Sequence, residues 1–190
     1  GRFGFNKESR LDEKSILIND ENRTKLFEEW SKYWNTDKKY LVEKSPPNII
    51  RTRFLQEMFP KSYFINITRH PIATSLATQK WSKTSLDSLI NHWIVCHKIY
   101  EDDKKFLKKS INFKYEDLIE NTDKTLKIIS EFLQTNIENN KEEIKKGINR
   151  KYFEIWEKKK TSFFSKRKIK KIIEKYEDEV NSFGYSLIDY

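Results

Sequence analysis

The feature that most constrains the fold is a short run at residues 62–68, which is rich in Tyr, Phe and Ile and lies between Pro60 and Pro71. A run of this composition, bounded by prolines, is typical of a buried β-strand. The pattern becomes helical immediately afterwards, because Pro71 suits the first position of a helix that we expect to extend to about Trp81. A strand that leads directly into a helix indicates an α/β fold.

Two other runs have strand character, at residues 40–43 and at residues 111–115, where apolar side chains alternate. Helical patterns lie around and between these runs, at residues 23–34, 46–58, 84–100 and 122–134. Strands separated by helices indicate crossover connections and a parallel sheet. We therefore expect a three-layer α/β sandwich with a parallel sheet over residues 1–135.

Several details of these helices follow from their sequence. Thr84, with Asp87 three residues later, has the pattern of a capping box that begins the long fourth helix. The spacing of apolar residues in the last of these helices predicts that one face is buried, formed by Leu126, Ile129, Phe132 and Leu133.

Beyond residue 135 the strands stop and the chain becomes basic and helical. Five residues of this part share one helical face, and Gly184 is placed to end that helix. They are Ile169, Ile172, Ile173, Tyr176 and Val180. A length of 190 residues suits one domain, so we expect residues 1–190 to form a single domain with a helical part at residues 136–190.

The formal net charge of +9 favours an anionic partner, such as a nucleotide, a polyanionic sugar, a nucleic acid or an acidic membrane surface. The most basic stretch, residues 158–171, is interpreted first as a solvated helix face and loop. Cys96 is the only cysteine, which excludes an intrachain disulfide. No apolar run of about 18 residues occurs, and no histidine pair has metal-ligand spacing, so we expect neither a transmembrane segment nor a metal.

Two junctions between strand and helix are candidates for an anion site, since ligands of parallel sheets bind where strands lead into helix amino ends. Residues 43–48 place Lys44 at the first junction, and residues 68–75 place Arg69 at the second. The guanidinium offers a planar fork of donors for phosphate, and the lysine offers a compact charge for a leaving group. The alternative is that both cations pair with surface carboxylates.

The order of four short blocks resembles the sulfotransferases that use 3′-phosphoadenosine 5′-phosphosulfate. The blocks are Glu43-Lys44-Ser45-Pro46, Phe59-Pro60, Arg69-His70-Pro71 and Tyr115-Glu116-Asp117-Leu118. The resemblance covers about residues 39–135, with weaker similarity at Tyr152-Phe153, Trp156 and Phe183-Gly184-Tyr185. It implies a fold like that of the P-loop NTPases, present here in part. It also implies transfer of a sulfonate to a hydroxyl or amine acceptor, with a carbohydrate expected.

The resemblance also implies roles for particular residues. Arg69 corresponds to the residue that binds the 3′-phosphate of the nucleotide, and Lys44 to one that helps to stabilise the leaving phosphate. Glu43 is a further catalytic candidate, either as a base or by orienting Lys44. The family places a serine eight residues after the arginine, where this chain has Ala77, and the nearby hydroxyl residues Ser75 and Thr78 lie on other sides of the helix.

A second departure is the missing glycine-containing loop that binds the 5′-phosphosulfate in the family, since no glycine occurs between Gly4 and Gly147. With no initiator methionine, we expect a fragment that lacks this loop. The alternative functions are a non-catalytic module of the same fold that binds a nucleotide or polyanion, and a nucleic-acid-binding domain. The last would use residues 158–171, with Phe163 and Phe164 as stacking residues.

Overall fold

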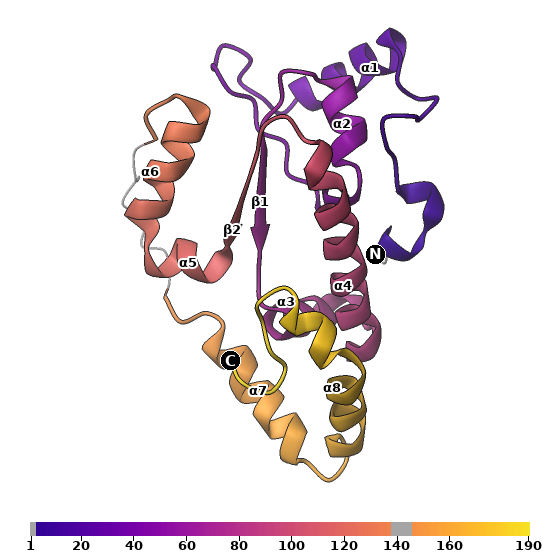
Figure 1. Ribbon diagram of the computed structural model, residues 1–190, viewed down its shortest axis with the longest axis vertical. Helices are drawn as coiled ribbons and strands as arrows, with labels where there is room; N and C mark the ends of the chain where they lie inside the picture. Colours follow the sequence, from indigo (N-terminus) through magenta and orange to yellow (C-terminus); the bar gives the residue numbers. More distant parts are fainter. Residues whose placement is uncertain (1–2, 138–145) are drawn as a thin grey trace. The chain divides into compact units, whose positions relative to one another are not determined.

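A computed structural model describes residues 3–137 and 146–190 of the chain (Figure 1). The described residues fall into two compact units. Of the described residues, the first unit comprises 65–94, 111–137 and 146–190, and the second comprises 3–64 and 95–110.

The sheet that the structure describes has two strands, β1 (Phe64–Thr68) and β2 (Ser110–Lys114). The two strands run parallel, as the arrows of Figure 1 show. The helices α3 (Pro71–Ser82) and α4 (Leu86–Asp103) lie between them in the sequence, which is the crossover that a parallel pair requires. The expected α/β fold with a parallel sheet is therefore confirmed.

The strand expected at residues 40–43 is wrong, because this segment is irregular. Val42 is 76% exposed, and its carbonyl oxygen accepts a hydrogen bond of 2.8 Å from Trp34 Nε1. An indole side chain thus takes the carbonyl that a neighbouring strand would have bonded. Apolar character over four residues predicts an extended segment, but it does not supply a partner strand.

The second unit contains α1 (Asp20–Ser31) and α2 (Thr52–Met58). The helix expected at residues 46–58 is divided into a 3₁₀ turn, η3 (Pro46–Ile50), and α2, with a break at Arg51. Ile50, Phe54 and Met58 are buried along it, as their spacing predicts. Three further 3₁₀ turns belong to this unit: η1 (Phe3–Phe5), η2 (Lys7–Ser9) and η4 (Lys104–Phe106).

The α1 helix begins and ends three residues earlier than the helix expected at residues 23–34, and it buries no residue completely. Its Trp30 ring lies 5.5 Å from that of Phe59 and 5.6 Å from that of Trp34, measured between centroids. Tyr33 lies beyond the end of α1 and is 88% exposed. This aromatic group is therefore a partly covered surface cluster.

The long helix α4 (Leu86–Asp103) continues from the first unit into the second. Its apolar stripe is buried at Leu86, Leu89, Ile90, Trp93, Ile94 and Tyr100. The expected cap at Thr84 is wrong by one residue, because Ser85 Oγ accepts the bond from Ser88 N at 3.3 Å. A serine is as good a cap as a threonine, and here it stands directly before the helix.

The first unit adds α3 (Pro71–Ser82), α5 (Tyr115–Glu120) and α6 (Thr122–Leu133). In Figure 1, α5 and α6 lie together on one side of the two strands. The burial expected for the apolar face of α6 is wrong, since Leu126, Ile129, Phe132 and Leu133 are only half-buried. The main partner of α6 among the described elements is α5, a helix of only six residues.

The main core of the first unit is helical and joins α3, the first half of α4, α7 (Arg150–Thr161) and α8 (Lys166–Asn181). Its most deeply buried members are Ile72, Ala73, Ile90, Ile94, Trp156, Val180 and Leu187. The stripe predicted for α8 is confirmed, with Ile173 partly buried and the rest buried. Gly184 has a φ of +72°, the left-handed conformation that ends a helix with little strain only at glycine.

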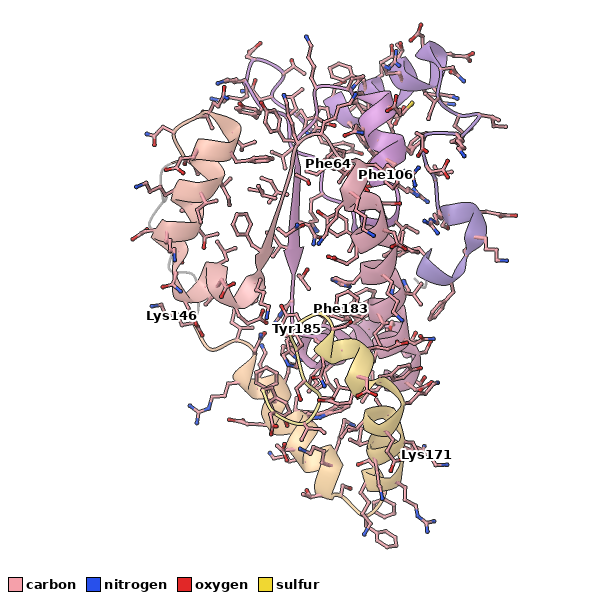
Figure 2. All side chains as sticks on the ribbon, viewed as in Figure 1. Phe64, Phe106, Lys146, Lys171, Phe183 and Tyr185 are labelled. Atoms are coloured by element: carbon pink, nitrogen blue, oxygen red, sulfur yellow. The ribbon has the colours of Figure 1, made fainter. Side chains whose placement is uncertain are left out.

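After Gly184 the chain returns to the strands. Tyr185 lies close to the carboxyl end of β1 (Figure 2), where its hydroxyl donates a bond of 3.2 Å to the carbonyl oxygen of Thr68. The residues that follow β1 are therefore packed against the far end of the chain. This contact positions the site described next.

Candidate anion-binding site

Arg69 lies directly after β1 and before α3, at the junction that the sequence predicts. Its Nε and Nη2 both donate to Asn149 Oδ1, at 2.9 and 2.8 Å. The backbone carbonyl of Arg69 accepts a bond of 3.0 Å from Trp93 Nε1, which fixes the main chain at this point. One amide oxygen thus orients the guanidinium, and this contact uses only two of its five N–H groups.

Asn149 is held in turn by Glu116. The Asn149 amide nitrogen donates a bond of 2.6 Å to Glu116 Oε1, which also accepts from the backbone N–H of His70 at 3.1 Å. The other carboxylate oxygen lies 3.0 Å from the Tyr185 hydroxyl, which shares its one proton between this oxygen and the carbonyl of Thr68. Burial next to this carboxylate raises the pKa of Tyr185, so the hydroxyl keeps its proton and remains a donor. Glu116 therefore joins segments from four parts of the sequence.

His70 forms the amino-terminal cap of α3. Its Nδ1 accepts a bond of 3.2 Å from the backbone N–H of Ile72, so this nitrogen carries no proton. Burial lowers the pKa of His70 to about 4, although the nearby Glu116 charge acts in the opposite direction. The neutral imidazole is thus part of the structure next to Arg69, and its protonation would break the cap.

Two tyrosine rings border the Arg69 guanidinium. Its central carbon lies 4.7 Å from the centre of the Tyr115 ring and 5.5 Å from that of the Tyr152 ring. The ammonium groups of Lys80 and Lys151 each lie 5.1 Å from the same Tyr152 ring centre. Three cations therefore surround one ring, and none of them forms an ion pair among the described residues. This excess of positive charge favours an anionic ligand.

The amino ends of two long helices meet at this network. His70 caps α3, and Asn149 stands immediately before α7. Asn149 makes no side-chain bond to the first turn of α7, because its side chain binds Arg69 and Glu116 instead. Helix amino ends carry partial positive charge, so both add to the attraction that the three cations exert on an anion.

The other residues predicted for this site lie along α3. Ala77 is half-buried and packs against the core that contains Tyr152, and it lies one turn from Lys80. Ser75 is buried, 2% exposed, and its hydroxyl has no hydrogen-bond partner. Thr78 is half-buried. Of these three positions, only Ala77 shares a helix side with Lys80.

The two predicted catalytic residues belong to the second unit. Glu43 is half-buried at the end of the segment that was expected to be a strand, and Lys44, which follows it, is exposed. Neither has an ion pair among the residues that the structure describes. Arg69 and the predicted residues of α3 therefore belong to the first unit, whereas Glu43 and Lys44 belong to the second.

Sequence reasoning did not identify Asn149, Lys80 or Lys151 as parts of a site. Asn149 lies 80 positions from Arg69, and an asparagine before a helix is normally interpreted as a cap. Glu116 belongs to one of the motif blocks, but its three bonds could not be inferred from the motif. The nearest signal was the weaker similarity at Tyr152 and at Tyr185.

Two further findings concern the described residues only. Residues 3–137 and 146–190 contain no group of three or more His, Cys, Asp or Glu side chains that could hold a metal ion. Within the same ranges, every helix is too short or too polar to cross a lipid bilayer.

Comparison with known proteins identifies the family. The model of the sulfotransferase family matches residues 5–139, which is more than half of the chain. The chain therefore belongs to the sulfotransferase family, and its function is of the sulfotransferase type. No curated protein and no solved structure matches the chain.

Proposed function

We propose that Arg69 binds the 3′-phosphate of 3′-phosphoadenosine 5′-phosphosulfate, and that the chain thereby takes part in sulfonate transfer to an acceptor. The acceptor is a hydroxyl or amine, of a carbohydrate as the resemblance implies. Membership of the sulfotransferase family supports the type of reaction. The choice of nucleotide, acceptor and binding residue is our proposal.

The observation that carries the proposal is the pair of bonds from Arg69 to Asn149. An arginine that only supports the fold is usually paired with a carboxylate, which cancels its charge. Here the partner is a neutral amide, and the carboxylate of Glu116 binds that amide instead of the guanidinium. The side chain is therefore oriented while its charge remains available to a phosphate.

The groups around Arg69 favour a ligand that carries a highly charged phosphate. Lys80 and Lys151 lie beside Tyr152, and the amino ends of α3 and α7 are adjacent. A phosphate monoester carries up to two negative charges and offers several acceptor oxygens, so it can satisfy several donors at once. In this proposal Lys44 acts on the leaving phosphate, and Glu43 orients Lys44 or acts as a base. Because transfer of this kind depends on position and charge, oriented donors are its main requirement.

The test is a calorimetric titration with 3′-phosphoadenosine 5′-phosphate. Arg69→Ala should weaken binding by about 10- to 100-fold, which corresponds to the loss of a charge-assisted bond of about 1.5–3 kcal/mol. Arg69→Lys should recover only part of this, since an ammonium lacks the planar fork. Equal affinities for all three proteins would show that Arg69 only supports the fold.

The role of Asn149 gives a sharper comparison. Asn149→Asp would pair with Arg69 and cancel its charge, so binding should weaken nearly as much as in Arg69→Ala. Lys127→Gln, on the exposed side of α6, changes the net charge by the same amount and should leave affinity unchanged. If Asn149→Asp binds the nucleotide as well as the unaltered chain, a neutral partner for Arg69 is not required.

A further inference from the structure

The turn between α7 and α8 exposes two large aromatic side chains. Phe163 is 81% exposed and Phe164 is 90% exposed. Their rings contact each other edge to face, with centroids 5.6 Å apart and planes at 87°. Burial of a phenylalanine ring is strongly favourable, so two adjacent exposed rings are unusual unless they meet a partner. Nothing in the proposed sulfonate-transfer site uses them.

The turn that carries these rings is well ordered by hydrogen bonds. Ser165 Oγ donates to the carbonyl of Lys159 at 2.8 Å, and Lys166 N donates to the carbonyl of Ser162 at 2.9 Å. On either side, Trp156 and Ile169 anchor the two helices in the core. The aromatic pair is therefore held outward by a fixed turn.

Basic side chains surround the aromatic pair. Residues 158–171 contain eight Lys or Arg and no Asp or Glu. Two of the eight have carboxylate partners, Lys160 with Glu157 at 2.8 Å and Lys170 with Glu174 at 3.6 Å. Six cations are therefore left without a carboxylate in the described structure, and one of them, Lys171, is labelled on α8 in Figure 2. We call residues 158–171 the α7–α8 tip.

We propose that the α7–α8 tip docks on an anionic lipid membrane, with Phe163 and Phe164 entering the interface between headgroups and acyl chains. A bilayer with acidic lipids offers negative charge at its surface and an apolar interior just below it. The tip matches this arrangement, because its two apolar rings lie at the turn and its cations lie along both flanking helices. Lysine stems can also lie along the apolar boundary while their ammonium groups reach the headgroups.

The ring geometry favours a membrane over a nucleic acid. Successive bases stack with their planes nearly parallel, so a stacking platform presents ring faces that are separately accessible. In the tip the two rings are perpendicular and in contact, and Lys166 Nζ lies 5.8 Å from the centre of the Phe163 ring. The pair therefore forms a single apolar projection, which suits insertion better than stacking.

The experiment is flotation of the 190-residue chain with vesicles of two compositions, phosphatidylcholine alone and phosphatidylcholine with phosphatidylserine. We expect binding to the acidic vesicles that falls as salt is added, and much weaker binding to the neutral ones. Replacing both aromatic residues (Phe163→Ser with Phe164→Ser) should reduce the partition coefficient by about tenfold or more. The control Trp81→Ser removes another exposed aromatic side chain, 72% exposed on α3, and should bind like the unaltered chain.

The contribution of the basic side chains to vesicle binding is tested with separate variants. Lys166→Gln with Lys168→Gln should weaken binding to acidic vesicles, whereas Lys124→Gln with Lys127→Gln removes two exposed charges of α6 and should not. All replaced side chains are exposed, so circular dichroism should show that every variant remains folded. Equal vesicle binding by the unaltered chain and the double Phe variant would overturn the proposal. Binding to a single-stranded oligonucleotide that depends on both Phe residues, without vesicle binding, would also overturn it in favour of nucleic acid.

Discussion

The two units of the molecule are stabilised in different ways. In the first unit, a helical core is closed by bonds from the end of the chain, such as Trp156 Nε1 to the carbonyl of Leu187 at 3.0 Å. In the second unit, arginines bind backbone carbonyls, as Arg23 does at Met58 and Arg51 at Ser9, both at 2.7 Å. The apolar side chains of its aromatic cluster are only partly covered.

The difference extends to the candidate functional residues. Arg69 is oriented by Asn149 and bordered by two rings in the first unit, whereas Lys44 stands exposed on an irregular segment in the second. The unit with the buried helical core is therefore also the unit in which the candidate residue, Arg69, is held by hydrogen bonds. A motif block alone thus does not determine how well its residue is positioned. Arg69 and Lys44 come from equally clear blocks, but only Arg69 is held by side-chain hydrogen bonds that the structure describes.

The largest expected effect is on the free energy of unfolding, and it should differ between one tryptophan of each unit. Trp156 is completely buried, so Trp156→Ala should lower the free energy of unfolding by about 3–5 kcal/mol. Trp30 is half-buried in the second unit, and Trp30→Ala should cost only about 1–2 kcal/mol. Urea denaturation of both variants measures these values. A loss for Trp30→Ala as large as that for Trp156→Ala would remove the contrast between the units.

The next effect is a pH dependence that belongs to the first unit. The pKa of His70 is about 4 in the folded chain and about 6.5 when exposed, so the unfolded state binds more protons between these values. Its contribution to stability is complete above pH 6.5 and should be lost as pH falls towards 4, by up to about 3 kcal/mol. Denaturation at a series of pH values measures it.

The matched variant for this test is His70→Asn. An asparagine oxygen can still accept the bond from Ile72 N but does not titrate, so the difference between the two proteins isolates His70 from the carboxylates that titrate in the same range. Parallel stability curves for the two proteins between pH 6.5 and 4 would show that the buried imidazole is not the group responsible.

The smallest expected effect is a change in nucleotide affinity on substitution of residues in α3. We expect Ala77→Ser to tighten binding of 3′-phosphoadenosine 5′-phosphate by about tenfold, because a hydroxyl at this position would donate to the phosphate. Ser75→Ala and Thr78→Ala should have little effect on affinity, since their side chains leave the helix in other directions. One titration series with the three variants decides this. No gain from Ala77→Ser, together with a large loss from Ser75→Ala, would show that Ser75 makes the phosphate contact.

Much of the fold could be predicted because local patterns determine it. The alternation of apolar residues located β2, the prolines located β1 and α3, and the helical spacing located α8. The segment at residues 40–43 could not be predicted correctly, because strand formation requires a partner that a short apolar run does not specify. The cap at Ser85 was missed because Thr84 and Ser85 are chemically almost equivalent.

The site was predicted only in part for a related reason. Arg69 could be found because it follows a strand and precedes a proline that begins a helix. Asn149 could not, because its role depends on a contact between residues 80 positions apart. Lys80 and Lys151 are two of many lysines in the sequence, and only their common distance from the Tyr152 ring distinguishes them.

The central claim is that Arg69 recognises a 3′-phosphate. The direct measurement is a calorimetric cycle in which the unaltered chain and Arg69→Ala are each titrated with 3′-phosphoadenosine 5′-phosphate and with adenosine 5′-phosphate. The account predicts that the unaltered chain binds the first nucleotide at least about tenfold more tightly, and that Arg69→Ala reduces this ratio to near one. Equal affinity of the unaltered chain for the two nucleotides, or a ratio that Arg69→Ala leaves unchanged, would contradict it.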